Sequence, residues 1–491
     1  MSGDGDTIAA VITAPGMGAM GALRLSGPAA LEAANRLFHH KNEQNTKALT
    51  GYDLAYGGVY VDGAFVDQAL MLTMRAPHSF TGEDVAELQC HGGPVVLARI
   101  QEALVSLPGL GVRLAEPGEF SRRAFLNGKM DLSRAEAIME LVAASNPLAA
   151  TLAADQVNGS LYRQLRALGD GILALLAEIE AEVDFPDEDL GRPGGLIART
   201  AEAGRLATEA DDLWACAERG RLCREGIRVA LYGRPNTGKS SILNGILRAP
   251  RAIVTPEPGT TRDVLEERVL LKGIPLVLTD TAGIRLTGSE AERVGVDRAK
   301  AVADSADLVL YVTELPVGIT PADAAILREM DREKTIIVFN KMDLLDETGE
   351  DASYRQEESV AGDETSDEAF DEAGDETGEF YASYRGWLSC RICALAQESL
   401  DTLAEAIRAF FSRGEAFRPK DGLLLNQRQS QALFQAKQAL GAAVAALQGH
   451  VPEDIAAIDL RQAWTCLGEL TGESLQPALV DRIFSTFCLG K

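Results

Sequence analysis

The chain has 491 residues and a formal net charge of −26 at pH 7, because 73 Asp and Glu residues outnumber 47 Lys and Arg residues. A hydrophobic fraction of 46% and a charged fraction of 24% are ordinary for globular domains, which excludes a wholly disordered, collagen-like or membrane-spanning chain. The acidic balance also argues against a nucleic-acid partner, since phosphate backbones are bound through Lys and Arg.

The N-terminal part of the chain contains two predicted patterns. Residues 1–128 alternate short β-like runs with Gly and Pro, and helical stretches are expected at 29–38 and 93–107, which predicts an α+β domain. From 129 to 224, Leu and Ala recur at helical spacing and predict the first part of an all-α domain. Its longest amphipathic run covers 147–183 and is expected to form a continuous helix.

A third pattern begins near residue 225. Between 225 and 420, continuous apolar runs such as I-R-V-A-L-Y and T-I-I-V-F alternate with helix-like segments, which predicts a parallel sheet covered on both faces. From 421 to 491 the chain is expected to be helical again. We therefore predict a multidomain α/β protein in which the sheet-containing domain is inserted into the all-helical one.

The acidic residues are concentrated in one stretch of the predicted sheet domain. Residues 346–379 hold fifteen Asp and Glu and a single base, Arg355, so they carry −14 of the charge and leave −12 for the remainder. The stretch offers few side chains to bury, which predicts a solvated, insertion-like loop, with an acidic tether for a basic partner as the alternative. We expect the whole insertion to cover 346–386.

A phosphate-binding motif, G-R-P-N-T-G-K-S, occupies residues 233–240. It matches G-x-x-x-x-G-K-[ST] and lies between a predicted strand and a predicted helix, as a P-loop requires. Lys239 is expected to contact the β- and γ-phosphates, and the Ser240 hydroxyl to bind Mg²⁺.

Three further motifs follow in the order expected of a GTPase. G-T-T-R-D at 259–263 offers Thr261 as a second Mg²⁺ ligand, and D-T-A-G at 280–283 follows an apolar strand. N-K-M-D at 340–343 ends in Asp343, whose carboxylate can accept two hydrogen bonds from the edge of guanine, a pattern that adenine cannot offer. Together the motifs predict a GTP-hydrolysing enzyme.

The position after D-T-A-G departs from the commonest GTPase pattern. Ile284 stands where many Ras-like proteins have a Gln that orients the attacking water. Glu292 is one candidate for that role, with Glu290 and Arg285 as its neighbours, and ordinary solvated charges are the alternative. The predicted catalytic residues are Glu292, Lys239 and Thr261.

The seven cysteines form no disulfide framework, and their odd number suits reduced thiols. Cys390 and Cys393 make a single C-x-x-C, which is weak support for a zinc site. The N-terminus has no basic and apolar signal region, and no run approaches the length of a spanning helix, so a cytoplasmic protein without membrane contact is expected.

In the order and wording of several long sequence motifs, the chain resembles the MnmE (TrmE) family of bacterial tRNA-modification GTPases. The resemblance covers essentially the whole length and is carried, outside the GTPase motifs, by S-F-T-G-E-D-V-A-E-L-Q-C-H-G-G-P at 79–94, P-G-E-F-S-R-R-A-F-L-N-G-K-M-D-L at 117–132, L-G-E-L-T-G-E at 467–473 and D-R-I-F-S-T-F-C-L-G-K at 481–491. S-C-R at 389–391 is similar to the S-A-[KR] that stacks on guanine.

This resemblance implies a folate-binding, dimerising N-terminal domain, a helical domain and an inserted Ras-like G domain. It implies a homodimer that works with the flavoprotein MnmG (GidA), which alone carries FAD, to add an aminomethyl or carboxymethylaminomethyl group at C5 of the wobble uridine of certain tRNAs. The implied cofactors are GTP, Mg²⁺, K⁺ and a tetrahydrofolate derivative, either 5,10-methylene- or 5-formyl-tetrahydrofolate. Hydrolysis is expected to depend on K⁺, with Glu292 positioning water.

The resemblance also implies site residues. GTP is expected to bind Asn236, Thr237, Gly238, Lys239, Ser240, Ser241, Thr255, Thr260, Thr261, Asp280, Thr281, Ala282, Gly283, Asn340, Lys341, Asp343, Ser389, Cys390 and Arg391. K⁺ is expected at Asn236, Thr255, Glu257 and Thr260, folate at Arg24, Glu87, Lys129 and Lys491, and a chemical role at Cys488 is weighed against a small buried side chain.

Two other readings of the chain stay open at this point. One is an assembly GTPase that shares the G domain without the chemistry, and the other is a one-carbon transferase regulated by a G domain. The N-terminal domain and the F-C-L-G-K ending disfavour the first, and the lack of an evident amine-substrate pocket disfavours the second. Much of the positive surface for tRNA is expected on the flavoprotein partner.

Overall fold

The computed structural model describes residues 5–40, 51–184, 195–248, 266–279, 302–344, 370–371, 381–384, 386–413, 422–449, 451–488 and 490. They fall into two compact units, which are described separately. The first comprises Met1–Met139, Gln156–Ala207 and Gln431–Lys491, and the second Glu140–Asp155 and Thr208–Ser430.

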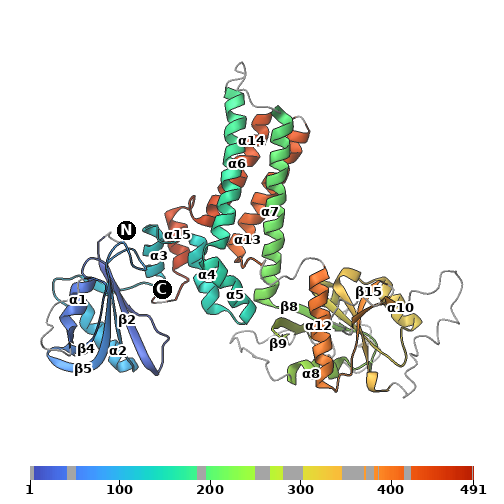
Figure 1. Ribbon diagram of the computed structural model, residues 1–491, viewed down its shortest axis with the longest axis horizontal. Coiled ribbons are helices and arrows are strands. Elements are labelled where there is room, and N and C mark those ends of the chain that lie inside the picture. Colours follow the sequence, from blue (N-terminus) through green and yellow to red (C-terminus); the bar gives the residue numbers. More distant parts are fainter. Residues whose placement is uncertain are drawn as a thin grey trace, which may run out of the picture. The chain divides into compact units, whose positions relative to one another are not determined.

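The first unit contains a seven-stranded sheet in the order β3-β4-β5-β6-β2-β1-β7. Its strands pair antiparallel except for β1 and β7, which are parallel. Helices α1 and α2 pack against the sheet and enclose a core that includes Leu23, Leu25, Met71, Leu88 and Ile100 (Figure 1). The bounds are β1 Thr7–Val11, β2 Gly18–Ser26, α1 Ala30–Leu37, β3 Phe38–His40, β4 Asp53–Val61, β5 Ala64–Met74, β6 Val85–Gly92, α2 Pro94–Val105 and β7 Val112–Leu114.

The helices of the first unit come from distant parts of the chain. α6 packs against α14, and α3 packs against α15 (Figure 1). Leu165, Leu168, Ile172 and Leu176 recur on one side of α6 at spacings of three and four and are all buried, which explains why this long helix is stable. The bounds are α3 Glu119–Leu126, α4 Leu132–Ala143, α6 Ser160–Asp184, α7 Gly195–Glu225, α13 Gln427–Gln448, α14 Glu453–Thr471 and α15 Pro477–Phe484; α4, α7 and α13 each extend across the division between the units.

Three expectations about secondary structure are corrected. The helix expected over 147–183 is two helices, α5 Pro147–Val157 and α6, because Gly159 adopts a left-handed conformation with φ of 80° between them. Helix α3 is not among the elements that the sequence patterns predict. The acidic stretch 346–379, expected to be a loop, contains the strand β13, Phe370–Asp371, and β14, Tyr381–Tyr384, lies in the rest of the insertion up to 386.

The second unit is built on an eight-stranded sheet in the order β13-β14-β15-β12-β11-β8-β10-β9. β10, β8, β11, β12 and β15 run parallel, as the continuous apolar runs predict, and β9, β13 and β14 extend the sheet antiparallel at its edges. The bounds are β8 Ile227–Tyr232, α8 Lys239–Arg248, β9 Glu266–Leu271, β10 Ile274–Thr279, β11 Leu308–Glu314, α10 Pro321–Arg328, β12 Thr335–Asn340, β15 Trp387–Arg391 and α12 Gln397–Arg413, with short 3₁₀ turns η1 Arg332–Lys334 and η2 Met342–Leu344.

The central strands of this sheet are buried on both faces. All six residues of β12 are buried, and Leu308, Leu310 and Val312 of β11 join the core formed with α8 and α12. This burial fixes the register, so the loops that follow the parallel strands lie along one edge of the sheet. None of the helices that the structure describes is long and apolar enough to cross a membrane.

Candidate functional site

The loop between β8 and α8, residues 233–238, packs closely against β11 and β12 at two glycines. Gly233 and Gly238 have φ of 135° and 96°, conformations that side chains with a Cβ rarely adopt. A Cβ on Gly233 would lie 2.2 Å from the Val312 carbonyl oxygen, and one on Gly238 would lie 2.0 Å from Asn340 Nδ2. Only glycine fits at these two positions, so the loop lies close against the neighbouring strands. The start of α8 follows the loop directly, where the N–H groups of a helix N-terminus can bind a phosphate.

Lys239, the first residue of α8, directly follows this loop, and its side chain reaches back to it. Its Nζ donates hydrogen bonds to the carbonyl oxygens of Gly233 at 2.8 Å and Arg234 at 2.5 Å. Burial lowers the pKa of the Lys239 ammonium below its ordinary value. An ammonium held by carbonyl dipoles in a half-buried loop is suited to meet a phosphate anion.

Asn340, the last residue of β12, joins three loops. Its Nδ2 donates to the Thr237 carbonyl oxygen at 2.9 Å, and its Oδ1 accepts from the Ala394 N–H at 3.0 Å. Asn340 and Thr237 are both almost completely buried. One amide side chain thus fixes the phosphate loop, the N-K-M-D motif and the loop after β15 relative to one another.

The other N-K-M-D residues lie at the same edge. Lys341 has φ of 63°, and its Nζ donates to Glu314 Oε1 at 2.7 Å. Asp343 lies in η2 and is exposed, so its carboxylate is accessible to a base. The Met342 N–H donates to the Ile392 carbonyl oxygen at 3.2 Å and ties η2 to the chain that follows β15.

The S-C-R motif occupies a different place from the one its assignment implies. Ser389 and Cys390 lie inside β15 with buried side chains, and Arg391 is its exposed last residue. The loop beside Asn340 is instead reached at Ala394, and the neighbouring Leu395 is 85% exposed. Sequence reasoning missed C-A-L at 393–395, although a small residue followed by Ala directly after a strand is the same signal as S-A-[KR].

The remaining residues of the predicted G-domain site divide into two groups. Ser240 and Asn236 are exposed at the phosphate loop, Asn236 with φ of 65°, and Ser241 lies in the first turn of α8. Nine residues of this predicted site lie outside the described residues: Thr255, Glu257, Thr260, Thr261, Asp280, Thr281, Ala282, Gly283 and Glu292. The folate candidate Lys491 also lies outside them. β10 ends at Thr279, one residue before Asp280.

In the first unit, Arg24 of β2 and Glu87 of β6 face each other across the sheet. Arg24 Nε donates to Glu87 Oε1 at 2.8 Å, and the guanidinium carbon lies 5.1 Å from the ring centre of Phe80 and 5.7 Å from that of Phe120. The pair is mostly buried, and among the described residues the Arg24 Nη groups have no acceptor. A cation and a carboxylate beside aromatic rings fit a flat heterocycle with an N–H edge.

The other folate candidates lie less centrally. Lys129 is exposed, and its aliphatic chain passes over Gly82, where an added Cβ would lie 3.2 Å from Lys129 Cγ. Cys488 is exposed, and its carbonyl oxygen accepts from the Gly118 N–H at 3.3 Å. Exposure of Cys488 argues against the alternative of a buried small side chain.

A cluster of ion pairs links β7, α3 and Asp6, the residue before β1. Glu119 is 4% exposed and accepts from Arg113 at 2.5 Å and from Arg123 at 3.0 Å. Burial alone would raise the pKa of Glu119, but these hydrogen bonds and one from the Glu116 N–H outweigh it and hold the pKa below its ordinary value. The cluster is satisfied internally and therefore anchors α3.

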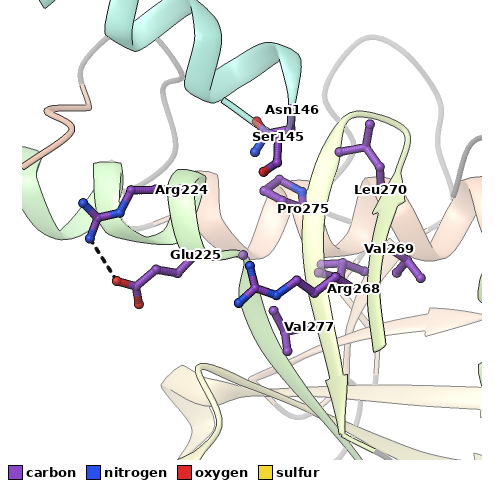
Figure 2. A pocket seen from close by; sticks show the side chains of 11 residues that line it. Ser145, Asn146, Arg224, Glu225, Arg268, Val269, Leu270, Pro275 and Val277 are labelled. Atoms are coloured by element: carbon purple, nitrogen blue, oxygen red, sulfur yellow. Dashed lines mark hydrogen bonds and ion pairs between the residues drawn. The ribbon is translucent and has the colours of Figure 1, made fainter. Parts of the chain in front are cut away.

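A separate hollow of about 40 Å³ lies before β8, at the end of that strand away from the phosphate loop (Figure 2). Asn146, Arg224 and Arg268 are among its lining residues, and Arg224 pairs with Glu225 at 3.1 Å. Ligand pockets usually measure roughly 300–1,000 Å³, so this hollow is too small for a nucleotide.

The described residues also bear on the C-x-x-C motif. Cys390 and Cys393 are free thiols, and across the described ranges no group of three or more His, Cys, Asp or Glu side chains is placed to hold a metal ion. Burial raises the pKa of the Cys390 thiol to about 12, which disfavours a thiolate ligand.

A glycine-framed phosphate loop at a helix N-terminus, joined by a buried Asn to an N-K-x-D motif, defines a P-loop nucleotide-binding protein of the GTPase class. The family model for the GTP-binding protein TrmE N-terminus matches residues 7–129, and the model for the MnmE helical domain matches residues 132–488.

Proteins of similar length resemble the whole chain. The tRNA modification GTPase MnmE of Desulforamulus reducens is 37% identical over 488 residues, covering 99% of both chains. That of Synechococcus sp. strain JA-3-3Ab is 41% identical over 492 residues, covering 99% of this chain and 98% of the relative. The chain belongs to the MnmE family of tRNA modification GTPases.

Among solved structures, an Aquifex aeolicus Era variant bound to GDP.AlF4- matches with a TM-score of 0.24 and 22% identity, covering 43% of this chain and 66% of that one. The G domain of the T. maritima FeoB iron transporter matches with a TM-score of 0.22 and 21% identity, covering 38% of this chain and 98% of that one.

Proposed function

We propose that this chain binds and hydrolyses GTP and that hydrolysis drives a modification of tRNA. The observation that carries the proposal is the double hydrogen bond of Asn340, which joins the phosphate loop to the loop that follows β15. Membership of the MnmE family supports the tRNA role.

In this proposal the nucleotide lies along the carboxyl edge of the parallel strands. The N–H groups at the start of α8 and the Lys239 ammonium bind the phosphates, and Asp343 accepts hydrogen bonds from guanine. The C-A-L loop at 393–395, rather than S-C-R, covers the base, with the exposed Leu395 against its face. Ser240 and Thr261 hold Mg²⁺, which neutralises phosphate charge.

Hydrolysis is proposed to depend on Glu292, because Ile284 cannot orient water. Glu292 positions the attacking water, and Lys239 stabilises charge that develops on the phosphate oxygens. Asn236, Thr255, Glu257 and Thr260 are proposed to hold K⁺, a cation that supplies the charge an arginine finger provides in other GTPases.

The domain assignments are part of the same proposal. Residues 1–128 bind a tetrahydrofolate derivative and dimerise, 129–224 and 421–491 form the helical domain, and 225–420 form a G domain inserted into it. Arg24 and Glu87 recognise the folate, with Lys129 and Lys491 near its tail and Cys488 as a residue with a possible chemical role.

The reaction and the partners complete the proposal. The homodimer acts in the cytoplasm with MnmG, which carries FAD, and together they add an aminomethyl or carboxymethylaminomethyl group at C5 of the wobble uridine. The one-carbon unit comes from the folate. Because this chain has a net charge of −26, much of the surface that binds tRNA is assigned to the partner.

Nucleoside analysis of tRNA tests the function. A strain without the gene should lose the C5 modification at the wobble uridine, and a plasmid with the native gene should restore it. Glu292→Ala should bind GTP normally, hydrolyse it at least about a hundredfold more slowly, as expected for loss of a water-positioning group, and fail to restore the modification. An unchanged nucleoside profile in the deletion strain would refute the tRNA role.

The cation proposal needs its own measurement. GTP turnover should be much faster in KCl than in NaCl at equal ionic strength, and Asn236→Ala should abolish that difference. Equal rates in the two salts would remove K⁺ from the proposal without affecting the tRNA role.

A further inference from the structure

Asp323, in the first turn of α10, is a carboxylate that is completely buried. Its Oδ2 accepts from the Thr320 N–H at 2.9 Å, and the Asp323 N–H donates to the Thr320 hydroxyl oxygen at 3.3 Å, which together form a helix capping box. Oδ2 also accepts from the Thr320 hydroxyl at 2.7 Å. Capping uses only this one oxygen. The other oxygen, Oδ1, accepts from the Tyr311 hydroxyl at 2.6 Å and from Arg234 Nε at 2.9 Å.

Arg234 is the second residue of the phosphate loop and connects this carboxylate to the ligand-facing lysine. Its side chain pairs with Asp323, and its own carbonyl oxygen accepts from Lys239 Nζ at 2.5 Å and from the Thr237 hydroxyl at 3.0 Å. The side chain and the carbonyl of one residue are thus both fixed, so the orientation of the Arg234 peptide depends on Asp323.

The segment that leads to Asp323 also holds the guanine motif. Glu314, at the end of β11, pairs with Lys341, and the Leu315 N–H donates to the Asn340 carbonyl oxygen at 2.8 Å. Residues 314–323 therefore contact the phosphate loop at one end and N-K-M-D at the other.

The charge state of the buried carboxylate is consistent with a permanent ion pair. Burial alone would raise the pKa of Asp323, but hydrogen bonds from Tyr311, Thr320 and Arg234 outweigh it and keep the pKa below its ordinary value. An ionised, buried partner restrains Arg234 more strongly than a neutral hydrogen bond would.

We propose that Asp323 and Arg234 are positioning residues that hold the phosphate loop in the conformation that binds the β-phosphate of the nucleotide. This inference rests on the proposed binding of GTP. It predicts that the Asp323–Arg234 pair affects the affinity for di- and triphosphates through the loop, and has no effect on recognition of the base or the α-phosphate.

Arg234→Gln tests the pair while leaving the capping box intact. Competition against a fluorescent guanine nucleotide should show GDP binding at least about tenfold weaker, equal to ~1.4 kcal/mol, and GMP binding changed by less than about twofold. Tyr311→Phe is the matched control, because it removes another hydrogen bond to the same Asp323 oxygen without touching the loop. It should change GDP binding by less than about twofold.

Arg234→Lys supplies a conservative rescue. It keeps the charge but not the directional Nε–H donor, so its GDP affinity should lie between those of the native chain and Arg234→Gln. If Arg234→Gln does not fold, Arg234→Lys alone decides, and GDP binding about threefold weaker with GMP unchanged is expected.

Two outcomes overturn the inference: native GDP affinity in the Arg234 variants, or GDP and GMP weakened by the same factor, which would indicate a general structural role. Failure of the native chain to bind GDP or GTP would instead refute the proposed function. If the native chain binds GDP tightly and Arg234→Gln binds it with the same affinity, only the positioning role is refuted.

Discussion

Replacing Gly238 by Ala should disrupt the nucleotide site through one collision. Gly238 has φ of 96°, and an added Cβ would lie 2.0 Å from Asn340 Nδ2. The left-handed conformation costs an L-residue ~1–2 kcal/mol. Displacement of Asn340 adds the loss of its buried hydrogen bonds to Thr237 and Ala394, at ~1 kcal/mol each.

Gly273, in the turn between β9 and β10, offers a matched control. Its φ is 87°, but nothing lies within 4 Å of an added Cβ. Gly273→Ala should therefore cost only the ~1–2 kcal/mol of backbone strain, whereas Gly238→Ala should cost ~3–4 kcal/mol. The difference of ~2 kcal/mol measures the collision with Asn340 and corresponds to about thirtyfold in an equilibrium constant.

Hydrogen–deuterium exchange of the β12 amides measures the stability of this part of the sheet, because slowly exchanging amides report the opening free energy. Titration calorimetry measures the affinity of the nucleotide site for GDP. We expect both variants to exchange faster, Gly238→Ala more so, and only Gly238→Ala to lose about thirtyfold or more in GDP affinity. Equal effects of the two substitutions on exchange and on GDP binding would refute the reasoning.

Two further predictions concern titratable groups. Burial raises the pKa of the Cys390 thiol to about 12, whereas Cys488 is exposed. A disulfide reagent at pH 8 should therefore modify Cys488 in the native protein and leave Cys390 unmodified until the protein unfolds. Rapid labelling of Cys390, mapped by peptide mass, would contradict this. The pKa of Glu119 is held below its ordinary value of 4.5, so its contribution to stability is present above that pH and is lost as the pH falls through the lowered pKa. Glu119→Gln should therefore lower the unfolding temperature near neutral pH and flatten its dependence on pH below 4.5, and an unchanged acid limb would argue against it.

The elements that sequence patterns predicted best are those decided by burial alone. The parallel strands of the second unit are short, continuous apolar runs. Such runs are typical of strands in a sheet that is buried on both faces. The break at Gly159 was missed because a glycine inside an Ala- and Leu-rich run is compatible with a helix and ends one only when its φ is positive. Helix α3 was missed because it buries Glu119 and Arg123, residues that an apolar periodicity does not count.

In the candidate site too, local sequence motifs were predicted, whereas features that depend on the fold were not. The phosphate loop and N-K-M-D are local motifs, so their residues were predicted, and the structure brings Thr237 and Asn340 together. The assignment of S-C-R instead depended on where β15 ends: Ser389 and Cys390 lie inside the strand, and the loop that contacts Asn340 lies at Ala394. The Arg234–Asp323 pair joins positions 89 residues apart and requires the register of β8 beside β11.

The pairing of α6 with α14 has a consequence for synthesis in the cell. Ribosomes add roughly 5–20 residues per second, so the about 270 positions between Asp184 and Glu453 take on the order of 13 to 50 s to translate. Throughout that time α6, whose residues Leu168 and Ile172 are buried in the folded chain, is without α14, against which it packs. We therefore expect chaperones that bind exposed apolar surface to bind the nascent chain at α6. The second unit can fold before the last helices of the first unit have been synthesised.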